Sequence, residues 1–205
     1  MAESIELPDN VVMMKSTNQI KELQTILLDR KTEHSDFVFY ADRLMRLVVE
    51  EALNQLPVTA LTVSTPTHCK YKGQSFARGN CGVSLCRSGE AMEIALRQCA
   101  RSIRICKMLI GEEQKVLYAR LTSDMDSRRV LLLYPILSTG QTVLKAISAL
   151  KETGVPEENI YLVSLFAHES SIRRILDPYP DITIVVSSIS TILPLNFAMK
   201  YFGTE

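Results

Sequence analysis

The chain has 205 residues, 46% of them hydrophobic, so it is long enough to bury the core of one domain. Lys plus Arg and Asp plus Glu number 23 each, and the resulting zero net charge excludes a global field that attracts nucleic acid or an anionic membrane. Because no run is long enough to span a bilayer and the first residues do not resemble a signal peptide, we expect a cytoplasmic protein, with the nucleus also allowed. The five cysteines include no CxxC pair, so neither a disulfide framework nor a zinc site is predicted.

Two amphipathic helices are predicted near the start of the chain. Ser16 and Gln19 resemble a capping box, and apolar residues then recur at helical spacing over residues 17–28. A second helix, with Asp36 as its expected cap, ends near Pro57.

The middle of the chain is rich in strand patterns. Residues 58–65 and 81–86 are predicted strands, with a polar turn between them at Gly73. A helix is predicted over residues 90–100, and two further strands are expected to meet at Gly111.

From Val130 onward, strands and helices alternate. The predicted order is a strand from Val130, a helix to Thr153 capped by Gly154, a strand over 160–166, a helix over 170–176 and a strand over 182–186. This alternation predicts an α/β fold with a parallel sheet flanked by helices, as one domain over residues 1–205. Ligands of such sheets bind beyond the carboxyl ends of the strands, so the turns after Cys86 and Leu133 are expected to line one crevice.

Two of these turns carry groups suited to an anion. Thr139 and Gly140 stand where a buried strand turns into a helix, and the free N–H groups at a helix start favour phosphate. A turn without any ligand explains the same residues equally well. Arg87, at the end of another strand, adds a fixed positive charge. The segment is not a P-loop, since the GK[ST] ending is missing, and no GxSxG elbow supports a serine nucleophile.

Three motifs make the chain resemble the uracil phosphoribosyltransferases, especially their animal homologues. Cys86-Arg87-Ser88-Gly89 is similar to the family's L-R-A-G, Tyr134–Thr142 to its D-P-M-L-A-T-G-G-S, and Phe202-Gly203-Thr204 to its ending. The resemblance implies a type I phosphoribosyltransferase fold with N-terminal helices and a β-rich middle. It also implies the reaction of uracil with phosphoribosyl pyrophosphate to give UMP and pyrophosphate, in pyrimidine salvage and with Mg²⁺.

The resemblance also assigns residues to the two substrates. The residues implied for phosphoribosyl pyrophosphate are Arg87, Tyr134, Pro135, Ile136, Leu137, Ser138, Thr139, Gly140, Gln141 and Thr142. Those implied for uracil are Leu195, Asn196 and Phe197, in the segment that stands for the family's G-D-A-G-D-R. No residue is assigned as catalytic, and no protein ligand to a metal is assigned.

Departures from the family pattern leave two functional hypotheses open. Tyr134 replaces an aspartate, Gln141 replaces a glycine, and the arginine of the family's Y-R-D has no match near the acidic Gly111-Glu112-Glu113. The chain is therefore either an enzyme of low activity or a binding and regulatory homologue without turnover. An acid such as Asp124 or Glu90 facing the crevice in place of Tyr134 would favour the enzyme.

The family resemblance further implies regulation by GTP and assembly into a homo-oligomer. Several members respond to GTP, and the basic positions that match are Arg43, Arg78, Arg104 and Arg128, each of which also suits a surface ion pair. The resemblance also suggests a homo-oligomer built partly through the β-rich middle.

Overall fold

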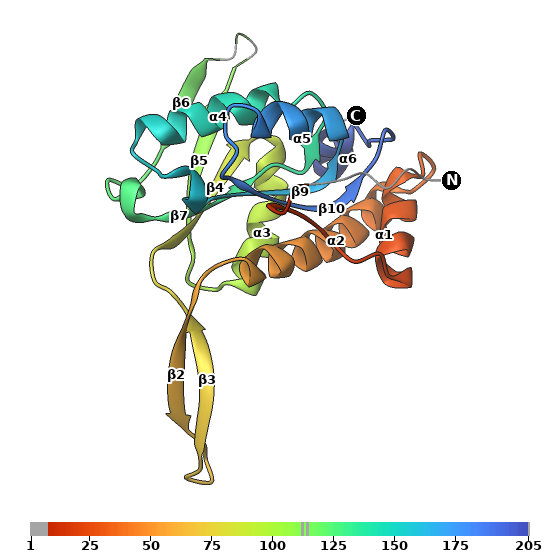
Figure 1. Cartoon of the computed structure of the whole chain (residues 1–205). Helices are drawn as coiled ribbons and strands as arrows, with labels where there is room; N and C mark the ends of the chain where they lie inside the picture. Colours follow the sequence, from red (N-terminus) through yellow and green to blue (C-terminus); the bar gives the residue numbers. More distant parts are fainter. Residues whose placement is uncertain (1–7, 112, 114, 205) are drawn as a thin grey trace.

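The computed structural model describes residues 8–111, 113 and 115–204, and it places a mostly parallel sheet between two layers of helices (Figure 1). The strands are β1 (Val11–Met13), β2 (Val58–Ser64), β3 (Lys70–Phe76), β4 (Asn80–Cys86), β5 (Arg104–Ile110), β6 (Val116–Arg120), β7 (Arg129–Leu133), β8 (Ile136–Leu137), β9 (Ile160–Ala167) and β10 (Thr183–Ile189). The helices are α1 (Asn18–Leu28), α2 (His34–Asn54), α3 (Ala91–Cys99), α4 (Gln141–Glu152), α5 (Glu169–Leu176) and α6 (Phe197–Phe202). The predicted α/β class is confirmed. Among these helices none has the length and apolarity needed to cross a membrane.

The main sheet runs in the order β1-β10-β9-β7-β4-β5-β6, with β8 added beside β9. Every pairing in it is parallel except that of β5 with β6. The central strands alternate their side chains between two cores. Val130 and Leu132 pack with α4 and α5 on one face, whereas Leu131 and Leu133 pack with α1, α2 and α3 on the other. Burial on both faces explains why β7 is an unbroken apolar run.

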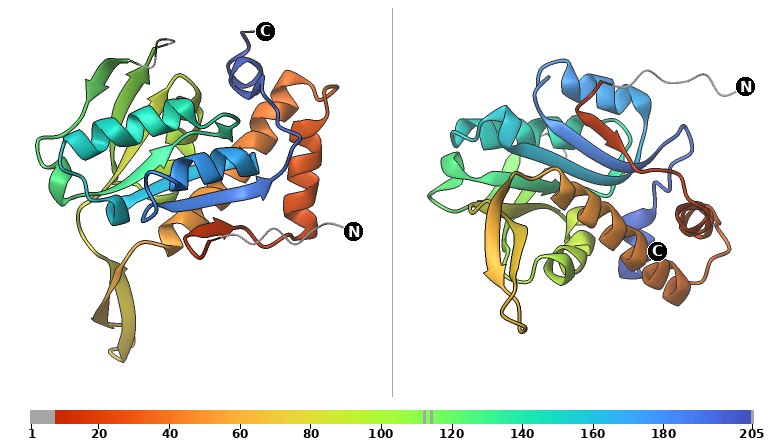
Figure 2. Two further views of the ribbon diagram at one scale, coloured as in Figure 1. Left: turned by 45° about the horizontal axis from the view of Figure 1, so that its top comes forward. Right: turned by 60° about the horizontal axis from the view of Figure 1, so that its bottom comes forward.

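The hairpin of β2 and β3 stands apart from this sheet. It forms a separate two-stranded antiparallel ladder that projects from the body of the molecule (Figure 1; Figure 2, left). All seven residues of β2 are exposed. The β-rich middle therefore divides into this arm and the strands β4, β5 and β6 of the main sheet.

Three local predictions were wrong. Thr17, not Ser16, caps α1, because the Thr17 hydroxyl accepts the N–H of Ile20. The helix α2 begins at His34, before Asp36, and Glu33 precedes it without a side-chain cap.

The third error concerns the turn of the hairpin. Gly73 lies inside β3, opposite Leu61, and the chain reverses at residues 65–69 instead. There the Thr65 hydroxyl accepts the N–H of Cys69, and His68 takes a positive φ of 61°. A hydroxyl bound to nearby main chain forms a turn without glycine.

Candidate functional site

The sheet changes direction between β4 and β7. These two strands are neighbours in the sheet, with Ser84 opposite Leu133. The sheet continues with β5 beside β4, and with β9 and then β10 beside β7. The loops after β4 and β7 therefore leave the sheet at its switch point, where open α/β sheets bind their ligands.

The loop after β4 presents Arg87 to solvent. The Cys86–Arg87 peptide is cis, and a short 3₁₀ helix, η1 (Ser88–Glu90), follows it. Gly89 is buried, and a Cβ atom there would lie 2.3 Å from the carbonyl O of Leu133, so only glycine fits against β7. Within the described part of the chain the guanidinium of Arg87 forms no ion pair, which leaves its charge available to an anion.

The loop after β7 leads into α4 through a left-handed glycine. Gly140 has a φ of +77° and precedes the first residue of the helix. The first helical bond runs from Leu144 N to Gly140 O at 2.9 Å, so the N–H groups of residues 141–143 have no acceptor within the helix. Ser138 and Thr139 beside them are exposed. Free N–H groups, hydroxyls and the positive end of the helix dipole together suit a phosphate group.

A small cavity of about 90 Å³ joins these two loops to the C-terminal segment. Its lining residues are Ser88, Tyr134, Pro135, Ile136, Ser138, Leu195 and Ala198. The prediction that the two turns line one crevice is therefore confirmed. Ala198 was not predicted; its only signal is its place in the segment that resembles the family's uracil loop.

The three residues implied for uracil do not all face this cavity. Leu195 lines it and is 72% exposed. Asn196 precedes α6. The Phe197 ring is fully buried between Phe37 and Tyr201, at centroid distances of 5.3 and 5.9 Å, so only its main chain is left to meet a base.

Tyr134 stands at the position where the family pattern has an aspartate. It is half-buried, packs against the core beneath α4 and also lines the cavity. Neither candidate acid replaces it. Glu90 is 2.6 Å from the Nζ of Lys107, and Asp124 precedes β7, at the opposite edge of the sheet.

The described residues do not fit a metal held by the protein. No group of three His, Cys, Asp or Glu side chains among them is placed to hold an ion. Glu112, part of the acidic segment noted in the sequence, lies outside the described residues. Tyr134 contributes a neutral phenol, which is a poor partner for a hard cation.

Three of the four arginines implied for GTP share the edge opposite the crevice. Arg78 lies two residues before β4, Arg128 directly precedes β7, and Arg104 begins β5. Arg128 is bound to Asp124, and this guanidinium holds the pKa of the Asp124 carboxyl well below its usual range. Arg43 lies instead on α2, over the rings of Phe39 and Tyr40.

The sequence model of the uracil phosphoribosyltransferase family matches residues 13–200 of this chain. The chain belongs to this family. It is 51% identical to a uracil phosphoribosyltransferase homolog of Danio rerio and 50% identical to one of Homo sapiens, each over 94% of this chain. It spans 77% of the length of the former and 64% of the latter. A uracil phosphoribosyltransferase of Dictyostelium discoideum is 44% identical, over 97% of this chain and 98% of its own length.

Two solved structures share the fold of this chain. A protein from Aquifex aeolicus aligns with a TM-score of 0.76 at 19% identity, over 88% of this chain and 87% of its own. An adenine phosphoribosyltransferase from Trypanosoma brucei aligns with a TM-score of 0.58 at 10% identity, over 90% of this chain and 85% of its own. At these identities the likeness concerns the fold alone.

Proposed function

We propose that this uracil phosphoribosyltransferase family member binds phosphoribosyl pyrophosphate at the switch point and transfers its phosphoribosyl group to uracil at a low rate. The observation that carries the proposal is that Ser88, which follows Arg87, and Ser138, which lies two residues before Gly140, line one cavity. The loop over residues 138–142, in which Ser138 and Thr139 are exposed, receives the 5-phosphate, and the small cavity beside Leu195 receives the base.

Catalysis would rest on position and charge. The ribose becomes cationic as pyrophosphate leaves, and Arg87 neutralises the departing charge with a fixed guanidinium. The Tyr134 phenol donates one hydrogen bond to a ribose hydroxyl. No protein nucleophile is required, and no step is assigned to a metal, because the described side chains do not hold one.

Binding without turnover is the second candidate, and Tyr134 favours it. A carboxylate at this position would stabilise positive charge on the ribose, whereas a neutral phenol supplies only a dipole. Loss of one such charge typically lowers a rate by about 10²–10³-fold. The same loop would then hold phosphoribosyl pyrophosphate or UMP as a regulatory ligand.

An assay of UMP formation over time distinguishes slow transfer from binding without turnover. It supplies the protein with labelled uracil, phosphoribosyl pyrophosphate and Mg²⁺. We expect slow UMP production that the Arg87→Ala variant abolishes and that the Arg97→Ala variant, which removes an exposed arginine of α3, leaves unchanged. A parent protein that forms no UMP but gives heat with phosphoribosyl pyrophosphate in calorimetry is a binding protein. Repeating the assay with GTP tests the regulation by this nucleotide that the family resemblance implies.

We also propose that the arm of β2 and β3 joins copies of this chain. Its ladder places Leu61, Val63 and Tyr71 on one face, and Lys70 and Lys72 on the other. The three apolar residues are 48%, 44% and 61% exposed. A lone two-stranded ribbon is marginally stable in water, so a second copy that covers this apolar face would stabilise the arm.

A further inference from the structure

The helix α5 lies against the loop that is proposed to hold the phosphate. A Cβ atom on Gly140 would meet Cγ1 of Ile175 and the carbonyl O of Ser171 at 3.3 Å each. The carbonyl O of Leu137 accepts the N–H of His168 at 2.8 Å, and the Ser171 hydroxyl is 3.0 Å from the same oxygen. This end of the loop is thus anchored mainly by main-chain contacts.

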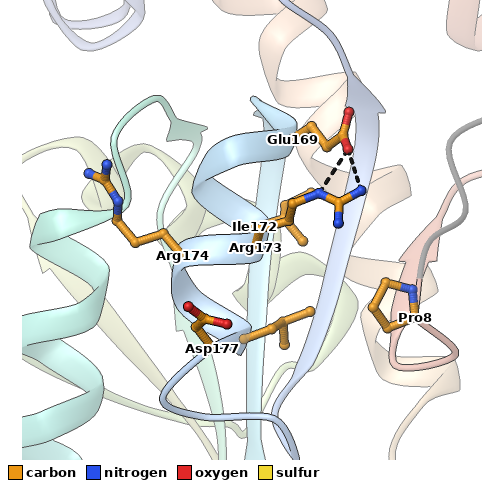
Figure 3. Close-up of a pocket in the computed structure, with 7 residues that line it drawn as sticks. Pro8, Glu169, Ile172, Arg173, Arg174 and Asp177 are labelled. Carbon is orange, nitrogen blue, oxygen red and sulfur yellow. Dashed lines mark hydrogen bonds and ion pairs between the residues drawn. The ribbon is translucent and has the colours of Figure 1, made fainter.

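The other end of the loop depends on one side chain. Arg174 Nη1 donates to the carbonyl O of Thr139 at 3.1 Å. Figure 3 shows that Arg174 points toward the side of α4, whereas the neighbouring Arg173 points the opposite way, to Glu169 and toward Pro8. Arg173 Nη2 is 2.7 Å from Glu169 Oε1. Two adjacent, exposed arginines on one helix therefore make different contacts.

Peptide geometry connects the Arg174 contact to ligand binding. In a planar trans peptide the carbonyl and the next N–H point in opposite directions. The peptides after Leu137 and Thr139 are trans, and both carbonyls point to donors on the α5 side. The N–H groups of Ser138 and Gly140 therefore point away from α5.

We propose that Arg174 is a positioning residue for the phosphate loop, which fixes the Thr139–Gly140 peptide so that its N–H group faces the ligand. The consequence for ligand binding rests on the proposed function. The contact made by Arg174, however, first affects the loop of the free protein. Without the guanidinium the peptide turns more freely, so the loop is less ordered before phosphate arrives.

Hydrogen exchange of the free protein, read on peptides covering residues 134–142, tests the positioning directly. We expect Arg174→Ala to speed exchange in this segment by about 3- to 10-fold, because it removes one hydrogen bond from a guanidinium. Arg174→Lys, which keeps a donor, should restore most of the protection. Arg173→Ala removes the same charge from the next residue and should leave the loop unchanged.

Calorimetry with UMP and with phosphoribosyl pyrophosphate gives the second readout. Arg174→Ala should weaken both ligands by about 3- to 10-fold, and Arg173→Ala should leave them as in the parent. Equal exchange in the two alanine variants overturns the inference, as does weaker binding without faster exchange, since the guanidinium would then act by its charge alone. A parent protein that binds neither ligand refutes the proposed function, while the exchange comparison still decides the role of Arg174.

Discussion

Gly140 combines a backbone requirement with a packing requirement. Its φ of +77° is costly for any other residue, and a side chain would press on Ile175 and on the main chain of Ser171. We expect Gly140→Ala to lower the free energy of unfolding by about 2 kcal/mol and to abolish binding of phosphoribosyl pyrophosphate. Denaturant unfolding and calorimetry measure the two effects.

A second glycine provides the control for Gly140. Gly79 also has a positive φ, of 95°, but a Cβ atom there would meet only the carbonyl O of Ser127, at 3.5 Å. Gly79→Ala should therefore cost about 1 kcal/mol and leave ligand binding intact. Equal losses in the two variants would show that packing against α5 has no part in the effect.

Because of Cys81, the free energy of unfolding is expected to fall at alkaline pH. Burial, with a smaller contribution from Cys106, raises the pKa of the Cys81 thiol from 9.0 to about 12. The unfolded chain thus loses this proton above pH 9, while the folded chain keeps it until about pH 12. The folded state binds more protons in this window, so the free energy of unfolding falls as pH rises, by up to about 1.4 kcal/mol per pH unit.

Urea unfolding at pH 8 and pH 10 measures this effect. We expect the parent to lose about 1 kcal/mol more between the two conditions than Cys81→Ala does. Other groups that titrate in this range contribute to both proteins and cancel in the comparison. Identical losses would mean that the thiol is ionised to the same extent in both states.

At the scale of single elements, the start of α1 gives a clear comparison between two adjacent residues. The Thr17 hydroxyl accepts the N–H of Ile20 at 3.3 Å, while Ser16 precedes the cap. Thr17→Ala should lower the free energy of unfolding by about 1 kcal/mol, and Ser16→Ala should change it by only a few tenths. Thermal unfolding of both variants measures the difference, and the reverse order would return the cap to Ser16.

Most of the long elements were predictable from sequence because each carries a strong period or a continuous apolar run. The elements β1, β8 and α6 were not predicted, since three, two and six residues are too few to show a period. The seven-residue strand β3 was also missed, because the glycine within it, Gly73, usually indicates a turn, yet here the ring of Tyr71 covers it. Two loops of the site followed from family motifs, but Arg174 did not, because its contact with Thr139 depends on how α5 packs.

At the scale of the whole molecule, the proposed assembly depends on the apolar face of the projecting arm. The double variant Leu61→Lys, Tyr71→Lys places two charges on the apolar face of the arm and should produce monomers. Thr62→Lys adds a charge to the opposite face and should leave the oligomer intact. Light scattering after size-exclusion chromatography measures the mass, and a parent that is already monomeric at micromolar concentration contradicts the proposed role of the arm.

The proposed association through the arm also affects how the stability of this protein has to be measured. An exposed ribbon that gains order from another molecule links folding to association, so dilution alone shifts the balance toward the unfolded chain. We therefore expect the midpoint of thermal unfolding to rise with protein concentration, and the variant with both lysines on the arm to lose that dependence. Melting temperatures of different variants are comparable only when they are recorded at the same protein concentration.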